Sequence, residues 1–233
     1  MDREIELFNN YYARFDNSHK SIKSKYDHTF RVVEYAKKIA HSLNLSDEDI
    51  NLAKICALFH DIGRFNEVKL FNDLDNNPFD HGDEGEKVLR ELNYDNDIVL
   101  KSTKYHNKYS VPDNLDERTK MFCNITRDAD KLDILYTQCL NIDKEESIEK
   151  DILDSIYSKK LVNNSKVSNS SESMIRGLSF IFDLNFNESF KIIDKDKIID
   201  QKLNILINNN YDKELDKLKI FIDNYLKERL KEC

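Results

Sequence analysis

Histidine and aspartate side chains recur in one order along the first 130 residues, beside signals that start or end helices. The stretch CALFHDIGRF, residues 56–65, begins as an apolar helical run and ends with an imidazole beside a carboxylate. YDHTF and DHGDEG place histidines beside turn signals, YHNKY closes a short helical pattern, and RDADKLD adds carboxylates on a later helix. The ordered candidates are His28, His60, Asp61, His81, His106 and Asp130.

These residue types suit divalent transition metals. Imidazole nitrogen and carboxylate oxygen are ligands for Mn, Fe, Zn, Ni and Co. At a helix end His60 and Asp61 can both reach one metal, or Asp61 can bridge two metals with its two oxygens. Two metals about 3.5–4 Å apart can share a hydroxide that is a nucleophile at neutral pH. The pattern predicts one or two such ions per chain, whereas His19 and His41 are interpreted as surface or core residues.

Helices are expected to position these side chains. The chain has four glycines and two prolines, fewer than sheets with tight turns normally need. Most of them lie between residues 60 and 115, where irregular backbone and the site are therefore expected. Gly63 is placed to end the helix that carries CALFHD, and residues 64–79 are interpreted as a connecting segment. The predicted fold class is all-α, and the helical spacing of apolar residues predicts further helices over 83–92, 96–106 and 115–140.

Composition and charge exclude several classes of function. The net charge is −8 and no basic stripe stands out, so no affinity for polymeric nucleic acid is expected. The first ten residues, MDREIELFNN, are charged, and no apolar run approaches the about 20 residues that span a membrane. The four cysteines form no CxxC pair, which is typical of a reduced, intracellular protein. A cytoplasmic location without a membrane partner is therefore expected.

Three stretches resemble successive elements of the HD-domain superfamily of metal-dependent phosphohydrolases: DHTFRVVEYAKKIA, HDIGRF and DADKLD. The resemblance covers roughly residues 24–140. His81 and His106 are similar to the extra histidines of the dinuclear branch, in which the Asp of the HD pair is the bridge. The resemblance implies that a first divalent metal is bound by His28, His60, Asp61 and Asp130.

The same resemblance implies an HD-domain helical bundle with a C-terminal helical extension. Residues 1–143 are expected to form the helical core with the metal site. Residues 144–233 carry amphipathic helical patterns without a candidate catalytic group, and we expect them to pack on the core. The oligomeric state stays open, and a homodimer is one option.

The implied activity is hydrolysis of a small phosphate ester, with a nucleotide or dinucleotide as the expected substrate, by attack of a metal-bound hydroxide. The expected catalytic residues are Asp61 on the metals, with Arg64 and Lys131 stabilising the developing charge. Arg64 stands near the place where mononuclear nucleotidases of the family carry an acid, which disfavours a 5′-nucleotidase. The ED pair of alarmone hydrolases and the GYP motif of cyclic-di-GMP enzymes are also absent. Two alternatives stay open, a non-catalytic nucleotide-sensing HD module and a di-iron oxygenase on the same scaffold.

Other charged residues near the candidates have open interpretations. Arg64 could hold a phosphate oxygen or form a salt bridge. Arg127 could orient a nearby aspartate ligand or pair with another acid. Asp133 is interpreted as a structural partner, and Asp80 or Asp83 could orient a histidine ligand from outside.

Overall fold

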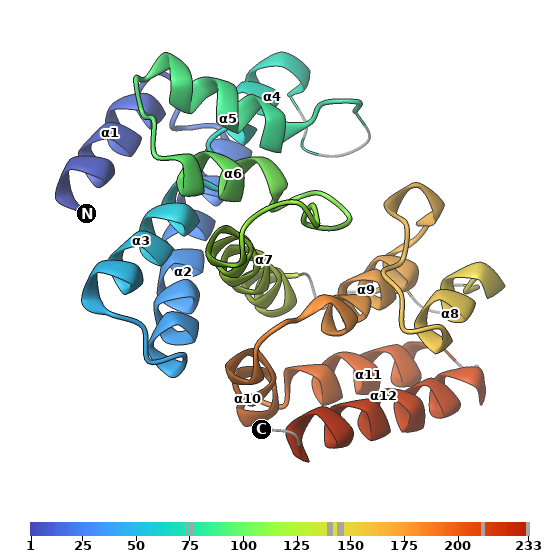
Figure 1. The fold of residues 1–233 in the computed structure, drawn as a ribbon. Coiled ribbons are helices and arrows are strands. Elements are labelled where there is room, and N and C mark those ends of the chain that lie inside the picture. Colours follow the sequence, from blue (N-terminus) through green and yellow to red (C-terminus); the bar gives the residue numbers. More distant parts are fainter. Residues whose placement is uncertain (73, 75–76, 139–141, 144–146, 211–212, 232–233) are drawn as a thin grey trace. The chain divides into compact units, whose positions relative to one another are not determined.

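Helices make up the regular structure of the protein. The structure, a computed structural model, describes residues 1–72, 74, 77–138, 142–143, 147–210 and 213–231. Within these ranges the chain forms α-helices and two short 3-10 helices and no strand (Figure 1), so the all-α prediction is confirmed. Of the helices in the described ranges, none combines the length and apolar character needed to cross a membrane.

The chain divides into two compact units, Met1–Asp133 and Ile134–Cys233. The division expected from the sequence, between residues 143 and 144, stays a prediction, and parts of that region (139–141 and 144–146) lie outside the described residues. The seventh helix begins in the first unit and ends in the second. The helices of the first unit are α1 (Asp2–Tyr12), α2 (Lys20–Ser42), α3 (Asp47–Phe59), α4 (Arg64–Phe71), α5 (His81–Glu91), α6 (Asp97–Tyr105) and α7 (Glu117–Thr137).

The centre of the first unit is α3, which packs against α2 and α6, while α5 lies beside α6. Ser46 caps the start of α3, because its side chain accepts a hydrogen bond from the backbone N–H of Asp49. The second half of α3 is buried on all sides, as its consecutive apolar residues predict. The most deeply buried of these residues are Cys56, Ala57, Leu58 and Phe59. The end of α3 is therefore held firmly where the chain reaches the HD pair.

Two features of this region differ from the prediction. The helix ends at Phe59, four residues before Gly63, and a turn leads directly into α4. The sequence offers no cap for α4, because Gly63 has no side chain at the N-cap position. Tertiary packing stabilises this short helix instead, since the Phe65 ring contacts the rings of Phe8, Tyr11, Tyr12 and Phe15. Residues 64–79 are thus half helix and half connection.

The second unit is a separate helical assembly. Its long C-terminal helix contacts α10 and α11, and leucine and isoleucine side chains of α11 and α12 are buried in its interior. Besides the end of α7 it contains α8 (Lys150–Tyr157), η1 (Asn164–Lys166), α9 (Ser170–Ser179), η2 (Phe180–Asp183), α10 (Asn187–Lys195), α11 (Ile198–Asn209) and α12 (Lys213–Lys231).

Candidate metal centre

The structure brings all six predicted ligands together in the first unit. Five of them are buried, and Asp130 is partly exposed. One expectation about their placement was wrong: His28 lies inside α2, which begins at Lys20, rather than near a helix end. The candidate ligands are His28 in α2, His60 and Asp61 directly after α3, His81 at the start of α5, His106 directly after α6, and Asp130 in α7.

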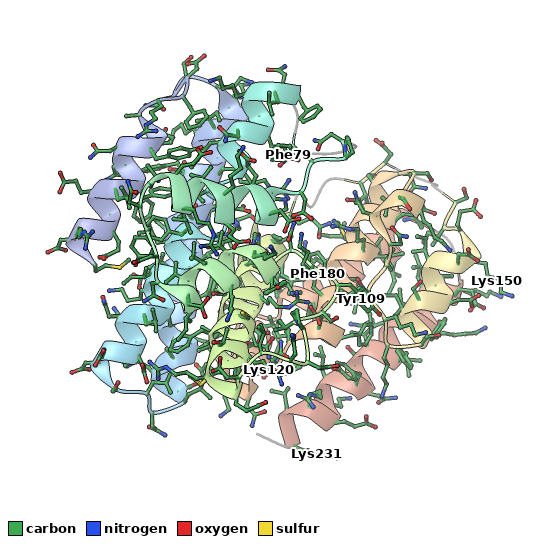
Figure 2. All side chains as sticks on the ribbon, turned by 45° about the horizontal axis from the view of Figure 1, so that its top comes forward. Phe79, Tyr109, Lys120, Lys150, Phe180 and Lys231 are labelled. Carbon is green, nitrogen blue, oxygen red and sulfur yellow. The ribbon has the colours of Figure 1, made fainter. Side chains whose placement is uncertain are left out.

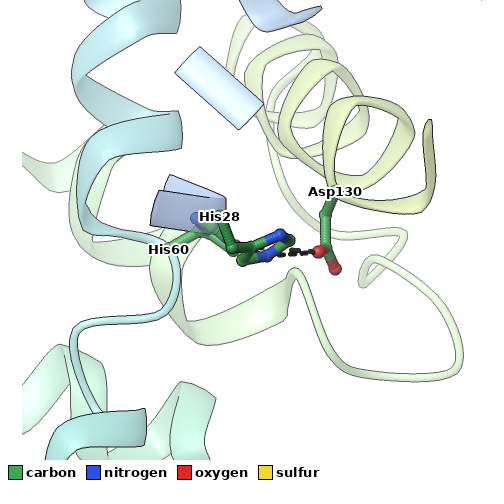
Figure 3. A group of neighbouring side chains, drawn as sticks. All are labelled: His28, His60 and Asp130. Carbon is green, nitrogen blue, oxygen red and sulfur yellow. Dashed lines mark hydrogen bonds and ion pairs between the residues drawn. The ribbon is translucent and has the colours of Figure 1, made fainter. Parts of the chain in front are cut away.

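His28, His60 and Asp130 form a first group. The Nε2 atoms of the two histidines lie 3.2 Å apart, and Asp130 Oδ1 lies 3.1 Å from His28 Nε2 and 3.7 Å from His60 Nε2. Figure 3 shows both imidazoles turned toward the Asp130 carboxylate. Two nitrogens bound at about 2.1 Å to one metal at a right angle are about 3 Å apart, so this spacing fits a shared ion.

His81 and His106 form a second group with Asp61. Their Nε2 atoms lie 3.1 Å apart, again the spacing of two ligands on one metal. Asp61 Oδ1 lies 3.3 Å from His106 Nε2 and 3.5 Å from His81 Nε2. His60 lies between the two groups, since its ring contacts those of both His28 and His106.

The two oxygens of Asp61 face different groups. Oδ1 faces the second group, whereas Oδ2 lies 3.5 Å from His28 Nε2 and 3.6 Å from His60 Nε2. A carboxylate in this position can give one oxygen to each of two cations. The helix end therefore places Asp61 where a bridging ligand would have to be.

Outer contacts orient three of the four imidazoles for metal binding. His60 Nδ1 donates to the carbonyl oxygen of Ala57, and His106 Nδ1 donates to that of Thr103, both at 2.7 Å. Because a carbonyl oxygen can only accept, each of these rings keeps a free lone pair on Nε2, facing the centre. His28 Nδ1 likewise donates to Asp133 Oδ2 at 2.6 Å. The donor set thus fits a divalent metal in chemistry as well as in spacing.

His81 is held less firmly. Its Nδ1 is paired with Asn107 Nδ2 at the long distance of 3.5 Å. Asn107 in turn donates to Asp80 Oδ1 at 3.0 Å, and Asp80 also caps the start of α5 by accepting from the backbone N–H groups of Gly82 and Asp83. Asp80 therefore acts on His81 through Asn107 and through the helix start rather than by direct contact.

In the second group the protonation states also suit metal binding. Burial lowers the pKa of His106 and of His81, and the positive charge of Arg64 lowers that of His81 further. Burial alone would raise the pKa of Asp61, but the nearby positive charge of Lys25 holds this pKa well below its usual value. Metals bind neutral imidazole and ionised carboxylate, so little proton release is needed in this half of the site.

Asp133 is the outer partner that connects two helices to the first group. It accepts a hydrogen bond from His28 Nδ1 at 2.6 Å and one from Arg31 Nε at 2.7 Å, as expected of a structural partner.

Asp133→Asn is expected to weaken Mn²⁺ binding by about 10- to 100-fold, because outer partners of metal-binding histidines typically contribute this much. Isothermal titration of the variant with Mn²⁺ measures the change. Asp97→Asn, an exposed site on α6 paired with Lys101, is the control and should bind Mn²⁺ normally. Unchanged binding in Asp133→Asn would contradict the assigned role.

The remaining charged candidates lie close to the centre in different ways. Arg64 Nε lies 3.6 Å from Asp61 Oδ1, and its Nη1 donates to Glu67 Oε2 at 2.7 Å. Lys131 is buried, and its Nζ donates to the carbonyl oxygen of Arg127 at 3.4 Å. Arg64 therefore forms salt bridges through both of these nitrogens, while a catalytic role of either residue stays a prediction.

The described hydrogen bonds of Arg127 go to backbone carbonyl oxygens, and its two interpretations stay predictions. Its Nη1 donates to the carbonyl oxygens of Tyr105 and His106, at 3.1 and 3.2 Å. These carbonyls end α6 and have no partner within the helix. A cation suits this position, since the end of a helix carries partial negative charge. Arg127 therefore fixes the backbone that carries His106.

Sequence reasoning missed Lys25. Its Nζ lies 2.8 Å from Asp61 Oδ2, closer than any described imidazole nitrogen. The available signal was its position three residues before His28, which places both side chains on one face of α2.

Comparison with known proteins gives one match. The family model of the HD domain matches residues 26–136, a range that contains all six candidate ligands. No curated protein and no solved structure is significantly similar to the chain.

Proposed function

Since residues 26–136 of this chain belong to the HD-domain family, we propose that the protein is a metal-dependent phosphohydrolase. The proposed substrate is a small phosphate ester, with nucleotides and dinucleotides as the first compounds to test. The observation that carries this proposal is the placement of Asp61, whose Oδ1 faces His81 and His106 while its Oδ2 faces His28 and His60. Two cations held side by side would stabilise the attacking and the leaving oxygen of a phosphoryl transfer to water, and a carboxylate shared between them would hold both in place.

Each group of ligands would hold one cation. The second group would comprise His81, His106 and Asp61 Oδ1. When bound, divalent cations lower the pKa of coordinated water and neutralise phosphoryl oxygens. The first group has more protein ligands and firmer outer contacts, so we expect it to bind its cation more tightly. It would comprise His28, His60, Asp130 and Asp61 Oδ2.

Arg64 is the residue best placed to stabilise charge on the substrate. Its Nη1 is anchored by Glu67 and by the carbonyl oxygen of Leu74, at 2.7 and 3.1 Å. Its Nε is buried and has no hydrogen-bond partner among the described residues. We propose that this fixed guanidinium donates to a phosphoryl oxygen, because a pre-positioned donor needs no rearrangement during the reaction. For Lys131 the support is its place beside Asp130, and its proposed contribution is smaller.

Metal analysis and turnover together test this function. Protein purified without a chelator or affinity tag is expected to contain about two divalent ions per chain. It should release phosphate or a nucleotide from at least one member of a panel of monoesters, diesters and dinucleotides. Two metals with no turnover but tight ligand binding would instead favour the nucleotide-sensing module. Iron together with oxygen uptake would favour the oxygenase.

The two groups can be separated by mutation. The double variant His81→Ala, His106→Ala is expected to retain about one metal per chain, because the first group does not use these residues. Elemental analysis of the variant measures this content. His19→Ala together with His41→Ala removes two histidines outside the ligand set, and this control should keep about two metals. Loss of all metal from the His81, His106 variant would show that the two groups do not bind independently.

A further inference from the structure

Lys25 forms an ion pair with Asp61, whose two carboxylate oxygens face the two groups of ligands. Its Nζ lies 2.8 Å from Asp61 Oδ2, and its side chain is 18% exposed. We propose that Lys25 is a substrate-binding residue: its ammonium competes with a metal for Asp61 Oδ2 and, once displaced by the metal, binds an oxygen of the substrate phosphate. This inference rests on the proposed function and adds a residue to it.

The competition follows from the position of one oxygen atom. Asp61 Oδ2 accepts from Lys25 and also faces His28 Nε2 and His60 Nε2 at 3.5 and 3.6 Å. It is therefore the oxygen that would serve the metal of the first group. A divalent ion on this oxygen would repel a neighbouring ammonium, because like charges at such short range interact strongly in a site with little water. The displaced ammonium is then stabilised most by binding an anion.

Two other cations near the centre are fixed in position. Arg31 donates twice to Asp133, at 2.7 and 3.0 Å, and Arg64 Nη1 is anchored on Glu67. Lys25 differs because its ammonium has three donors on a flexible four-carbon chain, so it can move from one acceptor to another.

Access and charge both favour a phosphate as the second acceptor. The partial exposure of Lys25 lets a ligand approach from solvent, whereas Asp61 is only 4% exposed at its side chain. Two divalent ions would carry more charge than the carboxylates of Asp61 and Asp130 together. A loaded site would thus attract a phosphate dianion, to which a lysine adds a charge-assisted hydrogen bond.

A purely structural ion pair makes the opposite prediction for metal binding. If Lys25 merely supports Asp61, its removal should misplace the carboxylate and weaken the binding of a metal. If Lys25 competes with the metal, its removal should strengthen metal binding and weaken phosphate binding. The two effects have opposite signs, so a measurement of binding alone separates the two roles.

The test uses the full chain, dialysed against a chelator and titrated first with Mn²⁺ and then, once saturated, with inorganic phosphate. Lys25→Met is expected to bind Mn²⁺ about three- to tenfold more tightly and phosphate about tenfold more weakly. Lys25→Arg, which keeps the charge, should bind phosphate with an affinity within about threefold of that of the wild-type protein. Lys23→Met is the matched control, because Lys23 lies on the same helix, is 65% exposed and pairs with Asp27. It should change neither titration.

Weaker Mn²⁺ binding by Lys25→Met, or unchanged phosphate binding, would overturn the inference. Lys25→Gln, which keeps a polar end without the charge, serves if Lys25→Met does not fold. The inference and the proposed function fail separately. If the wild-type protein hydrolyses no ester but Lys25→Met shows both changes in binding, the hydrolase proposal is refuted and Lys25 is supported as an anion-binding residue. If the wild-type protein is active but Lys25→Met shows neither change, the hydrolase proposal is supported and the role of Lys25 is refuted.

Discussion

Replacing Asp61 with alanine is expected to lower phosphate-ester turnover by about a thousandfold or more and the metal content to at most about one per chain. Asp61 gives one oxygen to each group of ligands, so its loss weakens both. Metal ions contribute several kcal/mol of transition-state stabilisation, and each 1.4 kcal/mol corresponds to about a factor of ten in rate. Elemental analysis and the rate of phosphate release from the best substrate measure the two effects.

The control for this experiment is Asp27→Ala. Asp27 lies beside His28 in the sequence, but its side chain is 46% exposed and pairs with Lys23 on the helix surface. Removing a surface ion pair changes stability by well under about 1 kcal/mol, so the Asp27 variant should keep its metals and its activity. Thermal unfolding of both variants shows whether loss of activity reflects loss of fold. A folded Asp61→Ala variant with wild-type turnover would rule out the shared-carboxylate mechanism.

The candidate ligands could be selected from the sequence because the chemistry of their side chains is visible there. An imidazole followed by a carboxylate at the end of an apolar helix has few structural uses, and His60 and Asp61 occupy such a place. Asp133 was predictable as a partner because it follows Asp130 by three residues and so lies on the same face of α7. The all-α class was equally accessible, since glycine and proline are scarce and apolar residues recur at helical spacing.

The features that could not be predicted from the sequence depend on contacts between segments that are distant along the chain. The α4 helix has no cap and is stabilised by the packing of Phe65 on aromatic rings more than 45 residues earlier in the chain. The acceptors of Arg127 are backbone carbonyls about 20 residues away, and a backbone acceptor cannot be recognised from the type of residue that carries it. Lys25 and Asp61 are separated by 36 residues. Periodicity reports the faces of single helices, and it does not report which charged side chain on one helix meets a carboxylate on another.

Gly63 shows how such a contact can decide the geometry of the site. Its backbone has ordinary helical angles, φ −70° and ψ −21°, which alanine adopts equally well. The reason for glycine is the close approach of α5: a Cβ at this position would meet the carbonyl oxygen of His81 and would lie 2.7 Å from the backbone nitrogen of Gly85. These neighbours are backbone atoms of α5 and cannot rotate away. An added methyl group must therefore push the first turn of α5, and His81 with it, away from the HD pair.

Gly63→Ala is accordingly expected to destabilise the protein by about 2–3 kcal/mol, at the upper end of the usual cost of overpacking. It should also lower the metal content from about two to about one per chain, because His81 would move away from His106 and Asp61. Urea unfolding and elemental analysis measure the two effects. Gly177→Ala in the second unit is the matched control, since its added methyl meets the side-chain amide of Gln138 and no candidate ligand. That variant changes packing elsewhere and should keep both metals. If Gly63→Ala also kept both metals at wild-type stability, α5 could shift without cost, and the second group of ligands would not depend on the tight contact between the HD turn and α5.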